Sequence, residues 1–359
     1  MGATANDDGG SGPGGASRRR LLLAGAAALL LIAGIAALLG KAAGYTRLLH
    51  ELRSADPRWL LLAFAAEALC FAGYITALRA VTGFEAGPVV SVRDAAHLAF
   101  ATLGAQRLFV GGGAGALALD YWALQKAGAR KAEAAARVLA LNLLLVAAVW
   151  AGTWLAALAL TLAEPSRAPL HLTLPWLLAV PGLFGLVRLV RAPQPRHGLG
   201  RPGAWLARSL TTVAASFTLV RRLVARPRRN ALALAAAAVD WIGDAACLWA
   251  GLRAFGIAID PGRLLLAYGT ASLVALLPLP LGGIGTMEAV LAGTVRAVGV
   301  PLAPALLGVL AYRLFNYWLP TIPGIAAFIG LPRLGARLAG GRRGPKAERR
   351  RASGRRPRQ

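Results

Sequence analysis

The chain has 359 residues, of which 57% are hydrophobic, and its mean hydropathy is +0.57. Several apolar runs reach about 20 residues, which is the length that a helix needs to span a bilayer. The composition therefore predicts an all-α, polytopic membrane protein and leaves little length for a soluble domain. The two cysteines fall in predicted spans and the four histidines are scattered, so we expect no disulfide framework, no metal site and no cofactor.

The N-terminal region begins with a polar segment. Residues 1–17 are rich in Gly, Ser and Asp, which predicts a disordered tail. Three arginines at 18–20 precede the apolar run 21–40. A cleaved signal peptide would have a shorter apolar core of about 7–15 residues, so we interpret this run as an uncleaved first span with a cytoplasmic N-terminus. Cleavage is the alternative.

Five further apolar runs follow, together with two strongly basic segments. The loop 191–229 is rich in arginine, so the positive-inside rule predicts that it is cytoplasmic. Its middle, 205–224, has the pattern of an interfacial amphipathic helix. The basic tail 332–359 is predicted to be disordered and cytoplasmic, where it would contact anionic lipid headgroups rather than nucleic acid. The five predicted spans are 59–82, 133–163, 170–190, 230–255 and 301–330.

The basic segments constrain the topology, because the N-terminus, the Arg-rich loop and the tail all favour the same side of the membrane. Simple spans at 89–116 and 262–282 would break this parity. The conflict disappears if 89–130 and 262–299 are re-entrant hairpins. The prediction is then six full spans and two hairpins in one transmembrane domain, 18–331, although a hydropathy count alone would give eight helices.

The two halves of the chain share a pattern. Each hairpin contains a glycine motif, and the span before each hairpin has an acid three residues before a cysteine. We therefore predict two repeats, 59–163 and 230–330, which are inverted because their hairpins would enter from opposite sides. Inverted repeats with broken helices are typical of transporters. The matched features are Gly112-Gly113-Ala114-Gly115 and Gly282-Gly283-Ile284-Gly285, and the pairs Glu67–Cys70 and Asp244–Cys247.

Three motifs carry a resemblance to a known family. Pro280-Leu281-Gly282-Gly283-Ile284-Gly285-Thr286-Met287-Glu288 has the pattern P-x-G-G-x-G-x-x-E, and Arg313 precedes Tyr317-Trp318-Leu319-Pro320. With the earlier Gly111-Gly112-Gly113-Ala114-Gly115, these residues resemble the lysylphosphatidylglycerol synthase transmembrane-region family of flippase-like integral membrane proteins. The first glycine motif departs from the family pattern, because Leu108-Phe109-Val110 stands where a proline is expected.

This resemblance covers residues 21–330 and implies translocation of phospholipids, including aminoacylated ones, across the bacterial cytoplasmic membrane. The best-understood relatives also carry a soluble aminoacyl-transferase domain after the membrane part. Here only a short Arg-rich tail follows, so we expect a protein that is not an enzyme and does not itself make lysylphosphatidylglycerol.

Charged residues at membrane depth are the candidate functional groups, because each needs a partner, a cavity or a ligand there. Glu288 either caps the helix that it begins or contacts a cationic headgroup or a proton. Arg313 pairs with Glu288 or Asp244, or contacts a lipid phosphate. Asp240 and Asp244 share one helix face and would need a cation, a proton or an arginine, although Asp240 could instead lie near the interface. Glu67 is the parallel case in the first repeat.

The first hairpin offers a second group of candidates. Arg107 and Asp120 flank the glycines and could pair with each other or contact a phosphate. The glycines themselves allow either close helix packing or a site lined by backbone. Asp94 and His97, near the start of the hairpin, fit a local ion pair or a proton relay. The candidate substrate-binding residues are Gly282, Gly283, Gly285, Glu288, Arg313, Asn316, Asp240, Asp244, Glu67, Arg107, Gly112, Gly113, Gly115 and Asp120.

The function predicted from these features is translocation of a phospholipid or lipid-linked substrate between leaflets. The alternative is a membrane scaffold or regulator that binds an envelope-lipid enzyme through its basic loop and tail. Deleting the tail separates the two, because a translocator should largely keep its activity. A membrane-embedded enzyme comes third, since no HxxxD, GxSxG or paired-carboxylate motif supports it.

Overall fold

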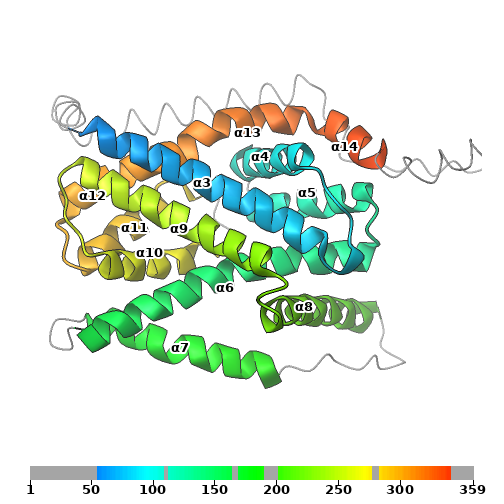
Figure 1. Ribbon diagram of the computed structural model, residues 1–359, viewed down its shortest axis with the longest axis horizontal. Helices are drawn as coiled ribbons and strands as arrows, with labels where there is room; N and C mark the ends of the chain where they lie inside the picture. The colour runs from blue at the N-terminus through cyan, green and yellow to red at the C-terminus, as the bar shows by residue number, and fades with distance from the viewer. Residues whose placement is uncertain (1–54, 109–111, 164–168, 190–200, 277–282, 341–359) are drawn as a thin grey trace, which may run out of the picture.

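A computed structural model describes residues 55–108, 112–163, 169–189, 201–276 and 283–340. Within these ranges the regular elements are all helical (Figure 1). Four helices are long and apolar enough to cross a membrane: α3 (Pro57–Thr82), α6 (Lys131–Ala163), α9 (Ala231–Ala254) and the rod Leu302–Ile329. The prediction of an all-α membrane protein is confirmed for the described part of the chain. The predicted first span at 21–40 lies outside it.

Helices α3 and α9 form the central pair and run antiparallel (Figure 1). The backbone N–H of Asp56, just before α3, donates to the carbonyl of Ala254, the last residue of α9, at 2.9 Å. Two glycines allow this close approach: a Cβ at Gly73 would lie 2.5 Å from the Asp240 nitrogen, and one at Gly243 would lie 2.7 Å from the Ala66 oxygen. Small residues at a helix crossing are typical of membrane bundles.

Two pairs of shorter helices flank this centre. They are α4 (Val92–Leu108) with α5 (Gly112–Ala127), and α10 (Pro261–Ala275) with α11 (Thr286–Ala297). At 12–17 residues each is shorter than the roughly 20 residues that a span requires. Figure 1 shows α4 and α5 toward the right of the bundle and α10 and α11 toward the left. Residues 109–111 and 277–282, where the predicted hairpins would turn, lie outside the described residues.

The short helices pack on the long ones through small residues. Helix α4 lies against α13 (Leu319–Ile329), where a Cβ at Gly104 would stand 2.4 Å from the Gly324 oxygen. Helix α10 lies against α6, where a Cβ at Gly269 would overlap the side chain of Thr153. The rod at the end of the chain therefore packs on α4 of the first helix pair, and α6 packs on α10 of the second.

One buried arginine ties α6 to the end of α3. Nη1 of Arg137 donates to the carbonyl oxygens of Val81, Thr82 and Phe84 at 2.8–3.1 Å. Its Nη2 pairs with Glu133 at 2.9 Å. The last carbonyls of a helix have no partner within the helix and carry the negative end of its dipole, so a cation stabilises them. Arg137 thus acts as the C-terminal cap of α3.

The remaining helices lie at the periphery. Helix α7 (Leu170–Leu189) forms where a span is predicted, but the apolar part described is only Leu170–Leu183. Helix α8 (Arg201–Ala225) coincides with the predicted amphipathic helix and packs on α6. Helix α14 (Leu331–Gly340) packs on α4 and α5 and buries Leu334 and Leu338. The predicted disorder from residue 332 is therefore wrong as far as 340, because an apolar face was overlooked.

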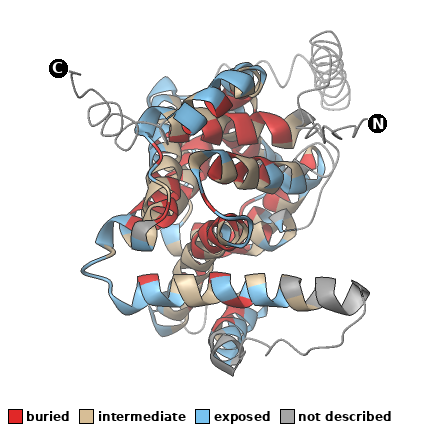
Figure 2. Ribbon diagram, turned by 90° about the vertical axis from the view of Figure 1, so that its right-hand side faces the viewer, coloured by how far each residue is buried: buried red, intermediate tan, exposed pale blue. Residues whose placement is uncertain are grey.

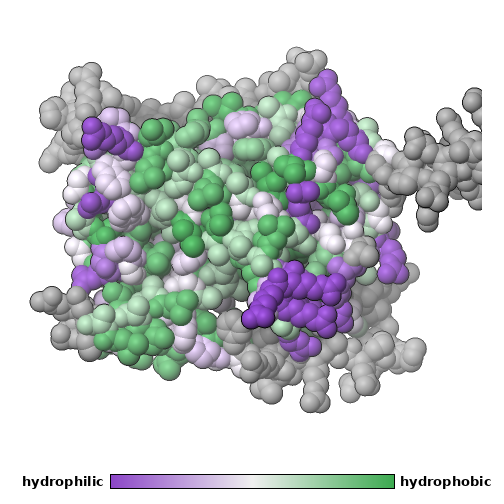
Figure 3. All heavy atoms as spheres, in the orientation of Figure 1, coloured by the Kyte–Doolittle hydropathy of each residue, from purple (hydrophilic) through white to green (hydrophobic). Residues whose placement is uncertain are grey.

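The surface has the polarity of a membrane protein. Figure 3 shows hydrophobic residues over the middle of one face and hydrophilic residues gathered toward its two ends. Large apolar side chains stand exposed on the long helices, for example Leu61 on α3 (69%) and Leu162 on α6 (73%), and on the peripheral α7, for example Leu178 (67%). Buried residues gather in the middle of the bundle when it is viewed from one end (Figure 2). An exposed apolar belt of this kind is suited to contact with the hydrocarbon chains of membrane lipids.

Candidate functional site

The site is organised by an irregular turn in the last rod. Helix α12 (Leu302–Arg313) continues through a π-helix, η3 (Leu314–Trp318), into α13. Pro320 has no N–H to bond the carbonyl of Asn316, so the regular helical ladder is interrupted there. Single π turns occur frequently at functional sites. In this rod the turn carries Asn316 and Tyr317, and Arg313 immediately precedes it.

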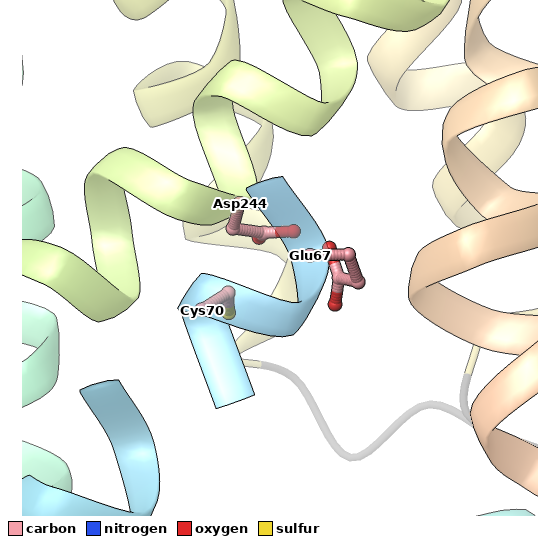
Figure 4. A group of neighbouring side chains, drawn as sticks. All are labelled: Glu67, Cys70 and Asp244. Carbon is pink, nitrogen blue, oxygen red and sulfur yellow. The ribbon is translucent and has the colours of Figure 1, made fainter. Parts of the chain in front are cut away.

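Asn316 joins two carboxylates from the central helix pair. Its Nδ2 donates to Oε1 of Glu67 at 3.2 Å and to Oδ1 of Asp244 at 2.8 Å. Oδ2 of Asp244 accepts from the hydroxyls of Tyr268 at 2.5 Å and Tyr312 at 3.1 Å. Figure 4 shows Glu67 on α3 and Asp244 on α9 close together. Four helical segments that are distant in sequence thus meet at one polar cluster.

The two acid-cysteine pairs of the proposed repeats meet in the same cluster. Sγ of Cys70 donates to Oδ1 of Asp240 at 3.6 Å, and the side chain of Cys247 hydrogen-bonds Glu67. Ligand-type atoms of Glu67, Cys70 and Asp244 all lie within 4.8 Å of one another (Figure 4). Asp240 therefore belongs to the buried cluster, as one of its two interpretations predicts. Both cysteines are free thiols.

Arg313 and Glu288 form the second part of the site. Nε of Arg313 lies 2.7 Å from Oε1 of Glu288, and the two side chains are only 7% and 12% exposed. The other oxygen, Oε2, accepts from the backbone N–H of Gly285 at 2.6 Å and so caps α11. Gly285 has φ +81°, a conformation that strongly favours glycine. Glu288 thus makes both of its predicted structural contacts, the cap and the pair with Arg313.

Two guanidinium groups converge on a single ring. Cζ of Arg107, in the last turn of α4, lies 3.6 Å from the centre of the Tyr317 ring, and Cζ of Arg313 lies 4.2 Å from it. Cation–π contact offsets part of the repulsion between such groups. Arg107 Nε and Arg313 Nη2 are buried without a hydrogen-bond partner among the described residues. The Tyr317 ring therefore holds two guanidinium groups together, and each has a buried N–H donor without a partner among the described residues.

Asp120 does not take part in the contacts of Arg107 and Arg313 with Tyr317. It hydrogen-bonds the side chain of Tyr74, while its Oδ1 is buried without a partner among the described residues. Since Arg107 Nε is also unpartnered there, these two atoms do not form the cross-hairpin pair that was one prediction. Arg107 instead contacts the ring of Tyr317, because α4 packs on the last rod.

The glycine candidates differ in what they do. Gly112 begins α5, followed by Gly113 and Gly115 in its first turn. A Cβ at Gly113 would meet nothing within 4 Å, so helix packing does not explain that glycine. Gly283 has φ +78°, and Gly282 lies outside the described residues.

Sequence reasoning missed the tyrosines. Tyr268 and Tyr312 donate hydrogen bonds to Asp244, and the ring of Tyr317 contacts the guanidinium groups of two arginines, Arg107 and Arg313. Tyrosine at a span end is an ordinary interfacial anchor. A tyrosine in the interior of an apolar segment, away from both of its ends, is the signal that could have identified these residues.

Comparison with known proteins identifies a family. The family model described as "Lysylphosphatidylglycerol synthase TM region" matches residues 25–324, which include all the residues of the cluster and of the arginine site. No curated protein matches the chain.

Proposed function

Because the chain belongs to the lysylphosphatidylglycerol synthase transmembrane-region family, we propose that it moves a phospholipid or lipid-linked substrate between the leaflets of a membrane. The observation that carries the proposal is the pair of guanidinium groups on the Tyr317 ring. A buried donor without a partner is costly, and a guanidinium at membrane depth more so. A phosphate group supplies several charged acceptors, and arginine binds it in a fork geometry. The substrate headgroup would satisfy Arg107 and Arg313 in passing.

Contacts of both helix pairs support a single path. Arg107, at the end of α4, contacts Tyr317, and Glu288, at the start of α11, pairs with Arg313. The end of α4 and the start of α11, which flank the two glycine motifs, therefore both approach the same π turn. Helices α5 and α11 begin after these breaks, and helix N-termini attract anions. We propose that the pairs are re-entrant hairpins whose N-termini face the passing phosphate.

The same contacts support an inverted repeat. The first helices of the two proposed repeats, α3 and α9, are antiparallel neighbours, and their Glu67 and Asp244 share Asn316. A two-fold axis in the membrane plane would relate such helices. In this proposal the acids handle a proton or a cationic group while the arginines hold the phosphate. Lipid tails stay in the bilayer throughout.

Orientation follows from charge. Arg-rich segments at the N-terminus, at 191–229 and after α14 favour a cytoplasmic location for both termini, and the composition fits a bacterial inner membrane. The basic tail would then contact anionic headgroups. In this proposal the protein is a transporter rather than an enzyme, so the lipids that it moves are chemically unchanged.

The test measures leaflet sidedness of fluorescent phospholipids in proteoliposomes. Arg107→Gln removes the charge but keeps a polar side chain, and we expect at least about a tenfold loss of rate, the equivalent of one charge-assisted hydrogen bond. Arg222→Gln is the matched control, because Arg222 makes an exposed pair with Glu85 away from the site. Equal rates in the two variants, or no movement of any anionic, zwitterionic or aminoacylated lipid by folded wild type, would reject the proposal.

A further inference from the structure

We propose that Glu67 carries an exchangeable proton and that its protonation is coupled to passage of the substrate headgroup. The coupling rests on the proposed transport function, whereas the protonated state of Glu67 stands on the hydrogen bonds around it. Glu67 lies in α3, is only 3% exposed, and has no exposed face through which water could solvate a charge. The two carboxyl groups that share Asn316 have very different surroundings.

Asp244 has more contacts that stabilise an anion than Glu67 has. Its Oδ1 accepts from Asn316, and its Oδ2 accepts from both Tyr268 and Tyr312. Three donors directed at one carboxylate favour its charged form. Arg313 adds a favourable electrostatic interaction.

Glu67 has fewer such contacts. Its Oε1 accepts the longer bond from Asn316, at 3.2 Å, and Oε2 is buried without a hydrogen-bond partner among the described residues. Cys247 adds only a thiol contact, and a thiol is a weak donor. An unpaired oxygen on a buried ion costs much more than the same oxygen on a neutral acid. The neutral acid is therefore the stable form of Glu67 in this geometry.

The charges facing Glu67 lead to the same result. Three carboxyl groups share this region, and Arg313, the cation near Asp244, is already paired with Glu288 at 2.7 Å. Adjacent carboxylates in a poorly solvated site keep one proton between them. The titratable groups that face Glu67 are Cys70 on its own helix, Asp240, Asp244 and Cys247 on α9, and Tyr312 on α12. Tyr268 on α10 and Arg313 on α12 contact or face Asp244.

A proton fits this cluster better than a metal ion does, although its ligand-type atoms lie within 4.8 Å of one another. Of the four carboxylate oxygens of Glu67 and Asp244, three accept from N–H or O–H donors. The hydrogens of those donors occupy the directions from which a cation would be bound. One free oxygen, Oε2 of Glu67, is enough for a proton, whereas metal ions take four or more ligands.

The cluster and the arginine site are joined through neighbouring residues. Asn316 holds the carboxylates, and Tyr317, the next residue of the π turn, holds Arg107 and Arg313. A phosphate at the arginines brings negative charge toward Glu67 and so favours its protonation. By linkage, a proton on Glu67 favours the phosphate to the same degree. Substrate and proton are therefore expected to move in the same direction.

Infrared spectroscopy of the reconstituted full chain tests the proton without requiring transport. We expect the carbonyl stretch of protonated carboxylic acids at neutral pH to lose intensity in Glu67→Gln and to keep it in the exposed control Glu85→Gln; Asp120, whose buried Oδ1 also lacks a partner among the described residues, contributes a separate component. Unchanged intensity in Glu67→Gln, or removal of the Glu67 component by Na⁺ at constant pH, overturns the proposal. If Glu67→Gln does not fold, isotope-labelled glutamate assigns the wild-type band, and an unshifted band likewise overturns it.

Transport under an imposed pH gradient then tests the coupling, with the membrane potential clamped. Wild type should move phospholipid faster in the direction of proton flow, and Glu67→Gln should lose this dependence. Equal rates in both directions for wild type contradict the coupling. If wild type moves no lipid at all, the transport function itself fails, while the infrared band still decides the state of Glu67.

Discussion

Arg313 and Glu288 form a buried ion pair, with Nε and Oε1 2.7 Å apart, between the end of α12 and the first turn of α11. The pair fixes the start of the second helix of the glycine-broken segment against the last rod. Since Glu288 also caps α11 through Gly285, a single carboxylate links backbone conformation and charge balance.

Removing that carboxylate should be strongly destabilising. Glu288→Gln leaves the Arg313 charge buried without its counter-ion, and we expect a loss of about 3–5 kcal/mol in the free energy of unfolding. Denaturant or thermal unfolding in detergent measures it. The double variant Glu288→Gln with Arg313→Gln should recover part of the loss, because no charge remains unpaired. A single variant as stable as wild type would contradict the buried pair.

Substitution of Arg137 should also lower the stability of the folded protein. Arg137→Met removes the donor shared by the carbonyls of Val81, Thr82 and Phe84 and keeps the aliphatic bulk. We expect a loss of about 2–4 kcal/mol, because three carbonyls lose a charged donor and the Thr82 carbonyl has no other donor among the described residues. Arg130→Met is the control: Arg130 also faces Glu133, but its side chain is 92% exposed, so no measurable change is expected. Similar unfolding curves for the two variants would show that Arg137 does not cap α3.

The contact between α14 and α4 should weaken in acid. Burial raises the pKa of Asp94, but hydrogen bonds from Arg337 and Ser91 and the charges of Arg337 and Arg93 outweigh this, so its pKa is lowered overall. A lowered pKa in the folded state gives stability that is present above the unfolded value, about 3.9, and is lost as the pH falls through the folded value. Limited proteolysis after α14 should therefore accelerate below about pH 4 in wild type.

Asp94→Asn provides the comparison. This variant lacks the ion pair with Arg337 at every pH, so its proteolysis should be faster at neutral pH and nearly independent of acid in this range. The same acid dependence in the variant would assign the effect to other groups.

Helix packing should be sensitive at Gly104. Gly104→Ala places a methyl group 2.4 Å from the Gly324 carbonyl oxygen, so α4 and α13 must move apart. We expect a loss of about 1–3 kcal/mol. Gly113→Ala is the matched control, because its methyl group would meet nothing within 4 Å. A normal melting temperature for Gly104→Ala would mean that the two helices are not in close contact.

Much of the helical fold is predictable from the sequence. The predicted spans 133–163 and 230–255 differ from α6 and α9 by two residues or fewer at each end, since long apolar runs determine them. Helix α3 begins two residues before its predicted start, because Asp56 caps it and Pro57 suits its first turn. The cost of burying a lone charge predicts an acid or a lipid phosphate as the partner of Arg313.

The site itself is less predictable, because it joins segments that are far apart in the sequence. Nothing local indicates that Asn316 would reach both Glu67 and Asp244, 249 and 72 residues away. The π turn follows from Pro320 only once the rod is known to continue through it. The alternative Arg107–Asp120 pair relied on closeness in sequence, whereas Arg107 reaches Tyr317, which packing of α4 on α13 brings beside it.

The most direct test of the central claim compares two lipids that differ in the headgroup phosphate. A fluorescent phospholipid and a glucosylceramide with the same fluorophore are followed in proteoliposomes of wild type and of Arg107→Gln with Arg313→Gln. Because the arginines on Tyr317 are assigned to the phosphate, wild type should move the phospholipid much faster than the glycolipid, and the double variant should move neither. Equal rates for the two lipids, or unchanged phospholipid movement in the double variant, would contradict phosphate recognition at this site.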